Sequence, residues 1–497
     1  MQVFTMAYLK KPELIFLLSA SNLLLFKYWL NLGVFSEEIR YYFFNKPTLE
    51  IFLGIILLLS FFSIFVVIFI FLKKNNLIYL KNLFILFLFL VVCDILRSAS
   101  NLLPISYFLE HKLISLGVFI LFAALYIKFI NLYSSIIQFF FVIFSPFIIV
   151  VFINLFNLLF ILNWDGNHKL IQNKNYENKK EKIILIIFDE LDLRVIKKGN
   201  YKYFNKILDK SDVYNNAFPS GDATLTIIPS ILTGSLLPFD TAKYNFSINE
   251  ITYEHEGQKK ELSKQENLFN LINKEKYKLG ILGIYHRYCN IFYNESNTCY
   301  EPNDEQYTIR NLGFTKYLIY SIIDIIPGSS KIKLFKNINP ENFNQYDLPV
   351  LRIENIKNYS KITPALIDNN DFIYIHIPLP HAPWIYYNKN FDFKKFNQFE
   401  QEGYYENMNL TDIYLGEIVE HLQKRKIFDS STIILASDHG WRTGDKNFIG
   451  SNTKTIDNRG GDILLSIKNI NQFKNKNIDK KIFNYELFNM IKIMLKN

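Results

Sequence analysis

The first third of the chain is dominated by long apolar runs. One of them, IFLGIILLLSFFSIFVVIFIFL at residues 51–72, contains no charge and is long enough to cross a hydrocarbon core of roughly 30 Å as a helix. Four further spans are predicted at about residues 14–35, 80–96, 113–129 and 136–162. The sequence therefore predicts an α-helical membrane domain of about five spans over residues 1–163.

Lysines set the predicted orientation of these spans. Lys10 and Lys11 precede the first span, Lys73 and Lys74 follow the second, and Lys27 interrupts the first. The positive-inside rule places the N-terminus in the cytoplasm, so that five crossings put everything after residue 163 on the outer face. A signal peptide is the alternative for the first span, but no small-residue cleavage site follows it.

The pattern changes after a polar stretch, residues 164–182, that is predicted to be a linker. Short apolar runs rich in β-branched residues follow at 183–188, 372–377, 432–436 and 463–467, and helical patterns lie between them, for example at 409–424. Short runs of this kind are typical of strands buried on both faces. Residues 183–497 are therefore predicted to form an α/β domain, with helices on both faces of a central sheet.

Composition narrows the class of protein. The 497 residues are 50% hydrophobic and 16% aromatic, which excludes wholesale disorder. The net charge of +9 fits a protein that works against an anionic lipid surface. Nucleic acid is the rival partner for a basic chain, but neither a basic helix nor an aromatic RNA-binding motif occurs, so no nucleic-acid partner is expected.

Cysteine usage agrees with an exported domain. Cys93 lies within a predicted span, which leaves Cys289 and Cys299 as an even pair in the outer domain. A disulfide between them is favoured because an exported domain permits it, and two unrelated buried thiols are the alternative.

Acidic residues follow two of the predicted strands. Asp189 comes directly after IILIIF, and Asp438 with His439 comes after TIILAS. An acid at a strand end is often only a helix cap. However, sites in α/β sheets lie beyond the carboxyl ends of strands, and two carboxylates with an imidazole can bind a divalent cation.

A third strand leads into the histidine-rich stretch IHIPLPHAPW. Its prolines restrict the backbone around His381, so this side chain is expected on a stiff loop, where it can contact a phosphate oxygen or carry a proton. A surface histidine in a proline-rich turn is the alternative reading.

The stretch GDATLTIIPSILTG, residues 221–234, carries four hydroxyls and is predicted to begin a helix near Ala223. Thr224 then lies in the first turn, where the helix dipole favours a phosphorylated or metal-bound oxygen. Simple capping of the helix is the alternative.

Taken in order, IIFDE, ATLTIIPSILTG, HIPLPHAP and SDHG resemble the motifs of the sulfatase-like branch of the alkaline phosphatase superfamily. Within it the chain is most similar to membrane-bound phosphoethanolamine and phosphoglycerol transferases. The resemblance covers about residues 182–467 and implies an alkaline-phosphatase/sulfatase-like sheet. It also implies the cytoplasmic (inner) membrane of a bacterium, with the catalytic domain on the periplasmic side.

The resemblance assigns a role to each motif. Thr224 matches the nucleophile, in preference to the neighbouring hydroxyls, and His381 matches the histidine that contacts phosphate, with His376 as a substrate-binding neighbour. The implied cofactor is a divalent metal, Zn²⁺ first and Mn²⁺ as the alternative. The implied metal ligands are Asp189, Thr224, Asp438 and His439.

Two departures refine the expected chemistry. Many relatives carry a further histidine after the Asp-His motif, whereas DNRGGDILLSIK at residues 457–468 places Asn458 there, as an expected substrate contact. The nucleophile region also lacks the Cys/Ser-x-Pro-x-Arg pattern of formylglycine sulfatases, so sulfate ester hydrolysis is not expected.

The reaction implied is transfer of a phospholipid headgroup, phosphoethanolamine or phosphoglycerol, through a phospho-threonine to an envelope glycan or lipid. A phosphodiesterase or phosphatase, with water as acceptor, would use the same residues. A membrane-anchored scaffold without turnover is the non-enzymatic alternative.

Overall fold

The computed structural model of the chain describes residues 9–32, 34, 48–100, 129–161, 169–171, 181–221, 223–247, 250–301, 340–386, 401–441 and 463–496. The chain divides into two compact units. The first comprises residues 1–164 and 309–343, and the second comprises residues 165–308 and 344–497.

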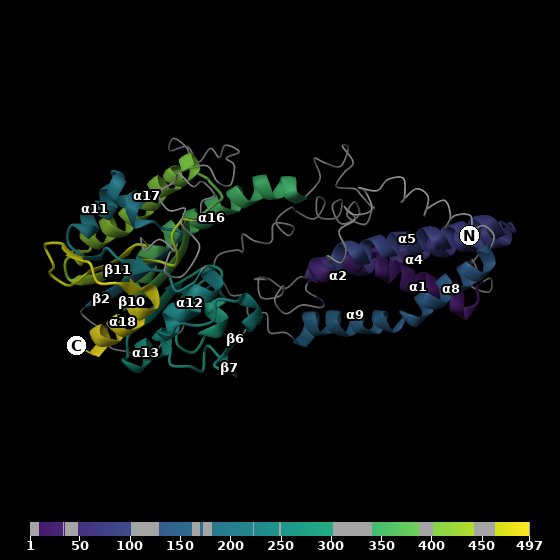
Figure 1. Cartoon of the computed structure of the whole chain (residues 1–497), viewed down its shortest axis with the longest axis horizontal. Helices are drawn as coiled ribbons and strands as arrows, with labels where there is room; N and C mark the ends of the chain where they lie inside the picture. The colour runs from purple at the N-terminus through teal and green to yellow at the C-terminus, as the bar shows by residue number, and fades with distance from the viewer. Residues whose placement is uncertain are drawn as a thin grey trace. The chain divides into compact units, whose positions relative to one another are not determined.

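The first unit is helical in its described part (Figure 1). An ion pair of 2.8 Å between Lys73 Nζ and Glu13 Oε2 joins two of its helices, α4 and α1. The helices are α1 (Lys11–Leu24), α2 (Phe26–Asn31), α4 (Thr48–Lys74), α5 (Ile78–Ser100), α8 (Ile130–Ile143) and α9 (Pro146–Phe156), followed by a π-helical turn η2 (Asn157–Ile161).

Within the described residues, two helical stretches rather than five are long and apolar enough to cross a membrane. These are Ile51–Lys74 and Ile130–Phe160, which contain most of the predicted spans 51–72 and 136–162. The predicted span 14–35 is broken at Leu25, and the 14 residues of α1 reach only about 21 Å.

The remaining two predicted spans differ in outcome. The apolar part of the span at 80–96 is the shorter stretch Ile78–Cys93, because Asp94 and Arg97 follow it in the sequence. The predicted span 113–129 lies, except for its last residue, outside the described residues.

The second unit contains a nine-stranded mixed sheet in the order β1-β9-β8-β10-β2-β11-β12-β3-β13. Strands β9, β8, β10, β2 and β11 run parallel, whereas β1 and β12 run antiparallel to their neighbours. The strands are β1 (Lys169–Ile171), β2 (Lys182–Asp189), β3 (Asp212–Tyr214), β8 (Leu279–Leu282), β9 (Thr298–Tyr300), β10 (Phe372–Pro380), β11 (Ser431–Ser437), β12 (Leu465–Lys468) and β13 (Lys476–Ile478).

Two smaller sheets accompany the nine-stranded sheet, and helices cover both faces of the nine-stranded sheet (Figure 1). The smaller sheets pair β4 (Ala217–Phe218) with β14 (Ile482–Phe483), and β5 (Tyr244–Ser247) with β6 (Glu250–His255) and β7 (Gln258–Glu261). The helices are α10 (Leu193–Lys198), α11 (Lys202–Leu208), α12 (Thr224–Thr233), α13 (Leu268–Lys274), α14 (Tyr288–Ile291), α16 (Pro340–Asn369), α17 (Gln401–Lys424) and α18 (Leu487–Lys496), with 3-10 turns η3 (Thr241–Lys243) and η7 (Asn484–Glu486).

Strand β2 shows why the apolar runs form a central sheet. Ile184, Ile186 and Phe188 alternate along the strand and join one buried core with residues of α16 and α17. Leu185 and Ile187 point to the opposite face and are equally buried. Each such side chain contributes about 1.5–3 kcal/mol by burial, so a continuous run is stable only between two layers of helices.

The predicted linker contains one element of the sheet. Residues 169–171, within the stretch 164–182, form β1, which pairs with β9. A three-residue strand is too short to produce a recognisable period, so the pattern of apolar positions did not mark it.

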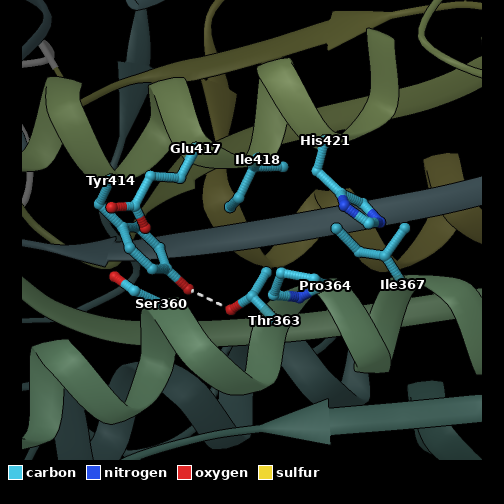
Figure 2. Close-up of a pocket in the computed structure, with 8 residues that line it drawn as sticks. All are labelled: Ser360, Thr363, Pro364, Ile367, Tyr414, Glu417, Ile418 and His421. Atoms are coloured by element: carbon cyan, nitrogen blue, oxygen red, sulfur yellow. Dashed lines mark hydrogen bonds between the residues drawn. The ribbon is translucent and has the colours of Figure 1, made fainter. Parts of the chain in front are cut away.

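Helices α16 and α17 pack against each other over the sheet, as Figure 2 shows for the middle of the pair. The hydroxyls of Thr363 on α16 and Tyr414 on α17 point toward each other and lie 2.8 Å apart. Beside them is a cavity of about 10 Å³, room for about one water molecule. These two helices therefore form one packed layer.

Candidate metal and phosphoryl-transfer site

Three predicted ligands meet at the carboxyl ends of β2 and β11. Asp189 is the last residue of β2, and Asp438 and His439 follow β11 directly. These strands are parallel neighbours with Ser437 opposite Phe188, so their ends coincide. All three side chains are buried, and one ligand atom of each lies within 4.8 Å of the others.

Thr224 is the first residue of α12 and reaches the same place. Its hydroxyl donates to Oδ2 of Asp438 at 2.7 Å and lies 3.5 Å from Nε2 of His439. Its position in the first turn adds the favourable end of the helix dipole to any negative charge on the oxygen.

The other hydroxyls of α12 are used within the helix. Thr226 donates to the carbonyl of Ala223, Ser230 to that of Thr226, and Thr233 to that of Pro229, at distances of 2.9–3.1 Å. Thr224 is therefore the hydroxyl of this helix that faces the carboxylates.

The ligands are held by neighbouring backbone and side-chain groups. Oδ1 of Asp438 accepts hydrogen bonds from the backbone N–H groups of Glu190 (3.1 Å) and His439 (2.6 Å). The amide of Asn484 donates to the Asp438 carbonyl at 2.6 Å and accepts from the N–H of Ser220 at 2.9 Å. The turn after β11 is thus tied both to β2 and to the segment before α12.

The donor set fits a divalent cation. The Oδ1 atom of Asp189 is buried and has no hydrogen-bond partner among the described residues, which is costly for a carboxylate unless a cation satisfies it. His439 donates from Nδ1 to the carbonyl of Gly440 at 3.0 Å, so the lone pair of Nε2 faces Asp189 Oδ1 (3.6 Å) and Asp438 Oδ2 (3.4 Å). Two carboxylates, an imidazole and a hydroxyl suit Zn²⁺ or Mn²⁺.

The two carboxylates differ in their proton affinity. Burial raises the pKa of Asp438 above its usual value, and the charge of Asp189 raises it further, against the opposite influence of His439. Burial also acts to raise the pKa of Asp189, but His381, His439 and His376 together hold it below its usual value. Asp438 is therefore the better proton acceptor of the two.

His381 lies on the loop that follows β10, and its side chain is 31% exposed. Its Nδ1 donates to the carbonyl of Ala382 at 2.6 Å, and its Nε2 lies 3.8 Å from Oε1 of Glu190. Although burial lowers the pKa of His381, the carboxylates of Asp189 and Glu190 raise it by more. Nε2 is therefore the ring nitrogen of His381 that can give or take a proton on the side of Glu190.

His376 occupies a different environment from His381. It is fully buried on β10, and its Nδ1 lies 2.9 Å from the hydroxyl of Tyr288, which in turn lies 3.1 Å from that of Tyr374. Burial lowers the pKa of His376 to about 4, so the ring is neutral at pH 7. Its predicted role in binding substrate stays a prediction.

Several residues around the site were not predicted. His286, which is buried, hydrogen-bonds the backbone of Thr224, and Tyr285 hydrogen-bonds Asp189. Both follow the carboxyl end of β8, a signal that the strand-end rule could have found. The hydroxyl of Tyr404 donates to the carbonyl of Glu190 at 2.6 Å and accepts from the N–H of Asp192 at 3.2 Å, and no motif marks it.

Two further predictions concern Cys289, Cys299 and Asn458. The structure contains the disulfide between Cys289 and Cys299, whereas Cys93 is a free thiol. Asn458 lies outside the described residues, so its predicted substrate contact stays a prediction.

The solved structures to which this chain is similar include Ps i-CgsB, a phosphonate monoester hydrolase and a lipoteichoic acid synthase. Ps i-CgsB is 14% identical over 64% of this chain and 72% of its own, with a TM-score of 0.43. The phosphonate monoester hydrolase of Agrobacterium radiobacter is 11% identical over 64% of this chain and 74% of its own, with a TM-score of 0.38. The lipoteichoic acid synthase LtaP from Listeria monocytogenes is 11% identical over 65% of this chain and 76% of its own, with a TM-score of 0.39. No curated protein matches the chain.

The comparison with protein families gives a match that covers the site. The sulfatase family profile matches residues 183–464, which is more than half of the 497 residues. This range contains Asp189, Thr224, His381, Asp438 and His439. The chain therefore belongs to the sulfatase family, within the alkaline phosphatase superfamily.

Proposed function

We propose that this protein is a metal-dependent transferase that moves a phospholipid headgroup, phosphoethanolamine or phosphoglycerol, to a glycan or lipid of the cell envelope through a phospho-threonine. The observation that carries the proposal is the contact of 2.7 Å between the Thr224 hydroxyl and Asp438 Oδ2, at the start of α12 and beside Asp189 and His439. A threonine nucleophile without the formylglycine pattern favours phosphoryl over sulfuryl transfer.

The first step uses groups already in contact. Thr224 Oγ1 attacks the phosphorus of the donor lipid, and its proton passes to Asp438 Oδ2, which already accepts its hydrogen bond. The bond from phosphorus to the lipid alcohol breaks, and His381 Nε2 supplies the proton that the leaving oxygen takes up. Asp189, Asp438, His439 and Thr224 would hold a divalent cation, which would supply positive charge near the threonine oxygen.

The second step reverses the first with a different alcohol. The acceptor hydroxyl gives its proton to His381 and attacks phosphorus, while Thr224 leaves and recovers its proton from Asp438. Water in place of the acceptor would make the same site a hydrolase, so the experiment must identify the product.

A lipid donor agrees with the first unit of the chain. The two apolar stretches Ile51–Lys74 and Ile130–Phe160 support anchoring in a membrane. The disulfide between Cys289 and Cys299 supports an oxidising compartment. On this support we propose the cytoplasmic membrane of a bacterium as the location, with the catalytic domain on the extracytoplasmic side, and Zn²⁺, or else Mn²⁺, as the metal.

The test is product analysis with a headgroup-labelled phospholipid and the purified full chain. The proposal expects diacylglycerol release, label on Thr224 when the reaction is stopped early, and label on an envelope glycan or lipid when that fraction is added. Free headgroup as the main product would establish a hydrolase. No label on the wild type, with no metal bound, would overturn the enzyme assignment and favour a scaffold.

A further inference from the structure

The loop that carries His381 is bound by a buried arginine from α16. Arg352 is 2% exposed, and its guanidinium donates to the carbonyls of Pro378, His381 (3.1 Å) and Ala382 (3.3 Å). A buried guanidinium is expensive to desolvate unless its donors are used. Here at least three of its hydrogen bonds go to the end of β10 and the loop that directly follows it.

A second buried side chain, from α17, contacts the same loop. Asn407 is fully buried, and its Nδ2 lies 3.1–3.2 Å from the carbonyls of Pro380, His381 and Pro383. Its Oδ1 accepts from the N–H of Ile385 at 3.1 Å. Arg352 and Asn407 therefore converge on the carbonyl of His381 from two helices.

The contacts continue into the imidazole of His381. The Ala382 carbonyl that accepts from Arg352 also accepts from Nδ1 of His381, at 2.6 Å. Fixing this carbonyl fixes which ring nitrogen carries the inward proton and leaves Nε2 on the side of Glu190. Satisfying loop carbonyls alone would not require that both side chains meet at the catalytic histidine.

We propose that Arg352 and Asn407 are positioning residues for His381: they hold the carbonyls of residues 378–383 so that Nε2 of His381 faces the phosphoryl group on Thr224. The step that they serve rests on the proposed function, whereas the orientation of the ring does not.

Two variants test the proposal in the purified full chain, with bis(p-nitrophenyl) phosphate as the probe. Arg352→Met and Asn407→Leu are each expected to lower kcat by roughly 10- to 100-fold, the cost of misplacing a catalytic group by about 1 Å. KM and bound metal should stay within about twofold of the wild type, because substrate and metal contacts remain. Asn407→Leu removes no charge, so it covers the case in which Arg352→Met fails to fold.

The matched control lies on the same helix layer. Thr363→Val removes the hydrogen bond between α16 and α17 that Figure 2 shows, without touching the loop. It should leave kcat unchanged even if it lowers stability. An equal loss of kcat in Thr363→Val would mean that general packing of the helices accounts for the effect, and would overturn the proposal.

A double-mutant cycle separates positioning from damage. In a His381→Ala background, Arg352→Met and Asn407→Leu should cost no further activity, because the group that they position is gone. If they cost as much there as in the wild type, the positioning role is refuted.

A spectroscopic measurement makes the outcome independent of turnover. The chain has eight histidines, and ¹⁵N-histidine spectra of the full chain can be assigned for His381 with His381→Ala. Both variants should lose the hydrogen-bonded Nδ1–H signal of His381, and Thr363→Val should keep it. A wild type without turnover would sink the proposed function alone, whereas an unchanged His381 signal in both variants would sink the positioning role.

Discussion

The replacement Asp438→Asn is expected to stabilise the metal-free protein while removing its activity. Asparagine keeps an oxygen that can accept from the backbone N–H groups of Glu190 and His439, and its amide can donate to Thr224. What it removes is a buried negative charge beside Asp189. The variant therefore separates the electrostatic requirement of the site from its hydrogen bonding.

The magnitude follows from the pKa of Asp438. Burial and Asp189 raise it from 3.8 to about 6 in the folded protein. At about 1.4 kcal/mol per pH unit, ionised Asp438 costs the folded state about 3 kcal/mol. Because the folded pKa is the higher one, the cost is absent below about pH 4, grows between about pH 4 and 6, and is complete above about pH 6.

The assay is thermal unfolding of the full chain in detergent with EDTA, monitored by tryptophan fluorescence. Trp441 can report on the site because its ring stacks on that of Tyr404 next to the site, with 4.1 Å between the ring centroids. At pH 7.5 the variant should melt roughly 6 to 12 °C above the wild type, and near pH 4 the difference should vanish. In a parallel series without EDTA, added Zn²⁺ should stabilise the wild type by about 2.7 kcal/mol at a hundredfold excess over Kd, and the variant much less.

The control is Asp429→Asn, which removes a half-exposed carboxylate paired with Lys210 at 3.2 Å. It should change stability by no more than about 1 kcal/mol and should keep the wild-type response to Zn²⁺, because the metal site is intact. An advantage of Asp438→Asn that is the same at pH 4 and pH 7.5, or none at pH 7.5, would refute the electrostatic reasoning. A wild type that Zn²⁺ and Mn²⁺ both fail to stabilise would refute the metal site.

Three further predictions address the nucleophile, the disulfide and Lys468 at the end of strand β12. Thr224→Ala should lower kcat by at least about 10³-fold and abolish the phosphorylated protein in intact-mass spectra. Thr224→Ser should keep part of the activity and part of the phosphorylation. A phosphorylated Thr224→Ala protein would show that another residue is the nucleophile. Replacing both Cys289 and Cys299 by serine should lower the free energy of unfolding by about 2.7 kcal/mol, because the disulfide closes a loop with a sequence separation of 10. A wild-type urea midpoint that is the same with and without reductant would contradict this. Burial lowers the pKa of Lys468 from 10.5 to about 8. The cost of keeping the Lys468 ammonium charged in the folded state is therefore complete below about pH 8 and is relieved between about pH 8 and 10.5. The urea midpoint should rise over this window, and Lys468→Met should flatten the rise.

The strands and the ligand cluster were predictable because each depends on a local pattern. The run before Asp189 and the run before Asp438 are short, apolar and β-branched, and they form the neighbouring parallel strands β2 and β11. Once two such strands are adjacent, the rule that carboxyl ends share one edge brings Asp189 and the Asp438–His439 pair together. The helix start at Thr224 followed from the same kind of local signal.

The residues that hold the site were not predictable in this way. Arg352, Tyr404 and Asn407 are polar positions on long helices, and in sequence they look like any residue of a solvated helix face. Their burial depends on how α16 and α17 pack over the sheet, which no local period encodes. Within the described residues, fewer helices than predicted are long and apolar enough to span a membrane, for a related reason. Hydropathy marks apolar segments, but it does not say where a helix such as α1 breaks.

The arrangement has a consequence for how the site works. The Asp438 carboxylate is fixed by backbone N–H groups, His439 by the Gly440 carbonyl and His381 by the Ala382 carbonyl, so protein contacts alone hold all three in place. Groups held in this way need little reorganisation when a cation or a phosphoryl group arrives, which is the condition for electrostatic stabilisation of a transition state. The same rigidity prevents Asp189 and Asp438 from moving apart to relieve their repulsion. The contacts that hold the site therefore have two effects: they preorganise it for transfer, and they keep the repulsion that destabilises the folded protein. A variant that relaxes this repulsion should gain stability only by losing preorganisation and activity.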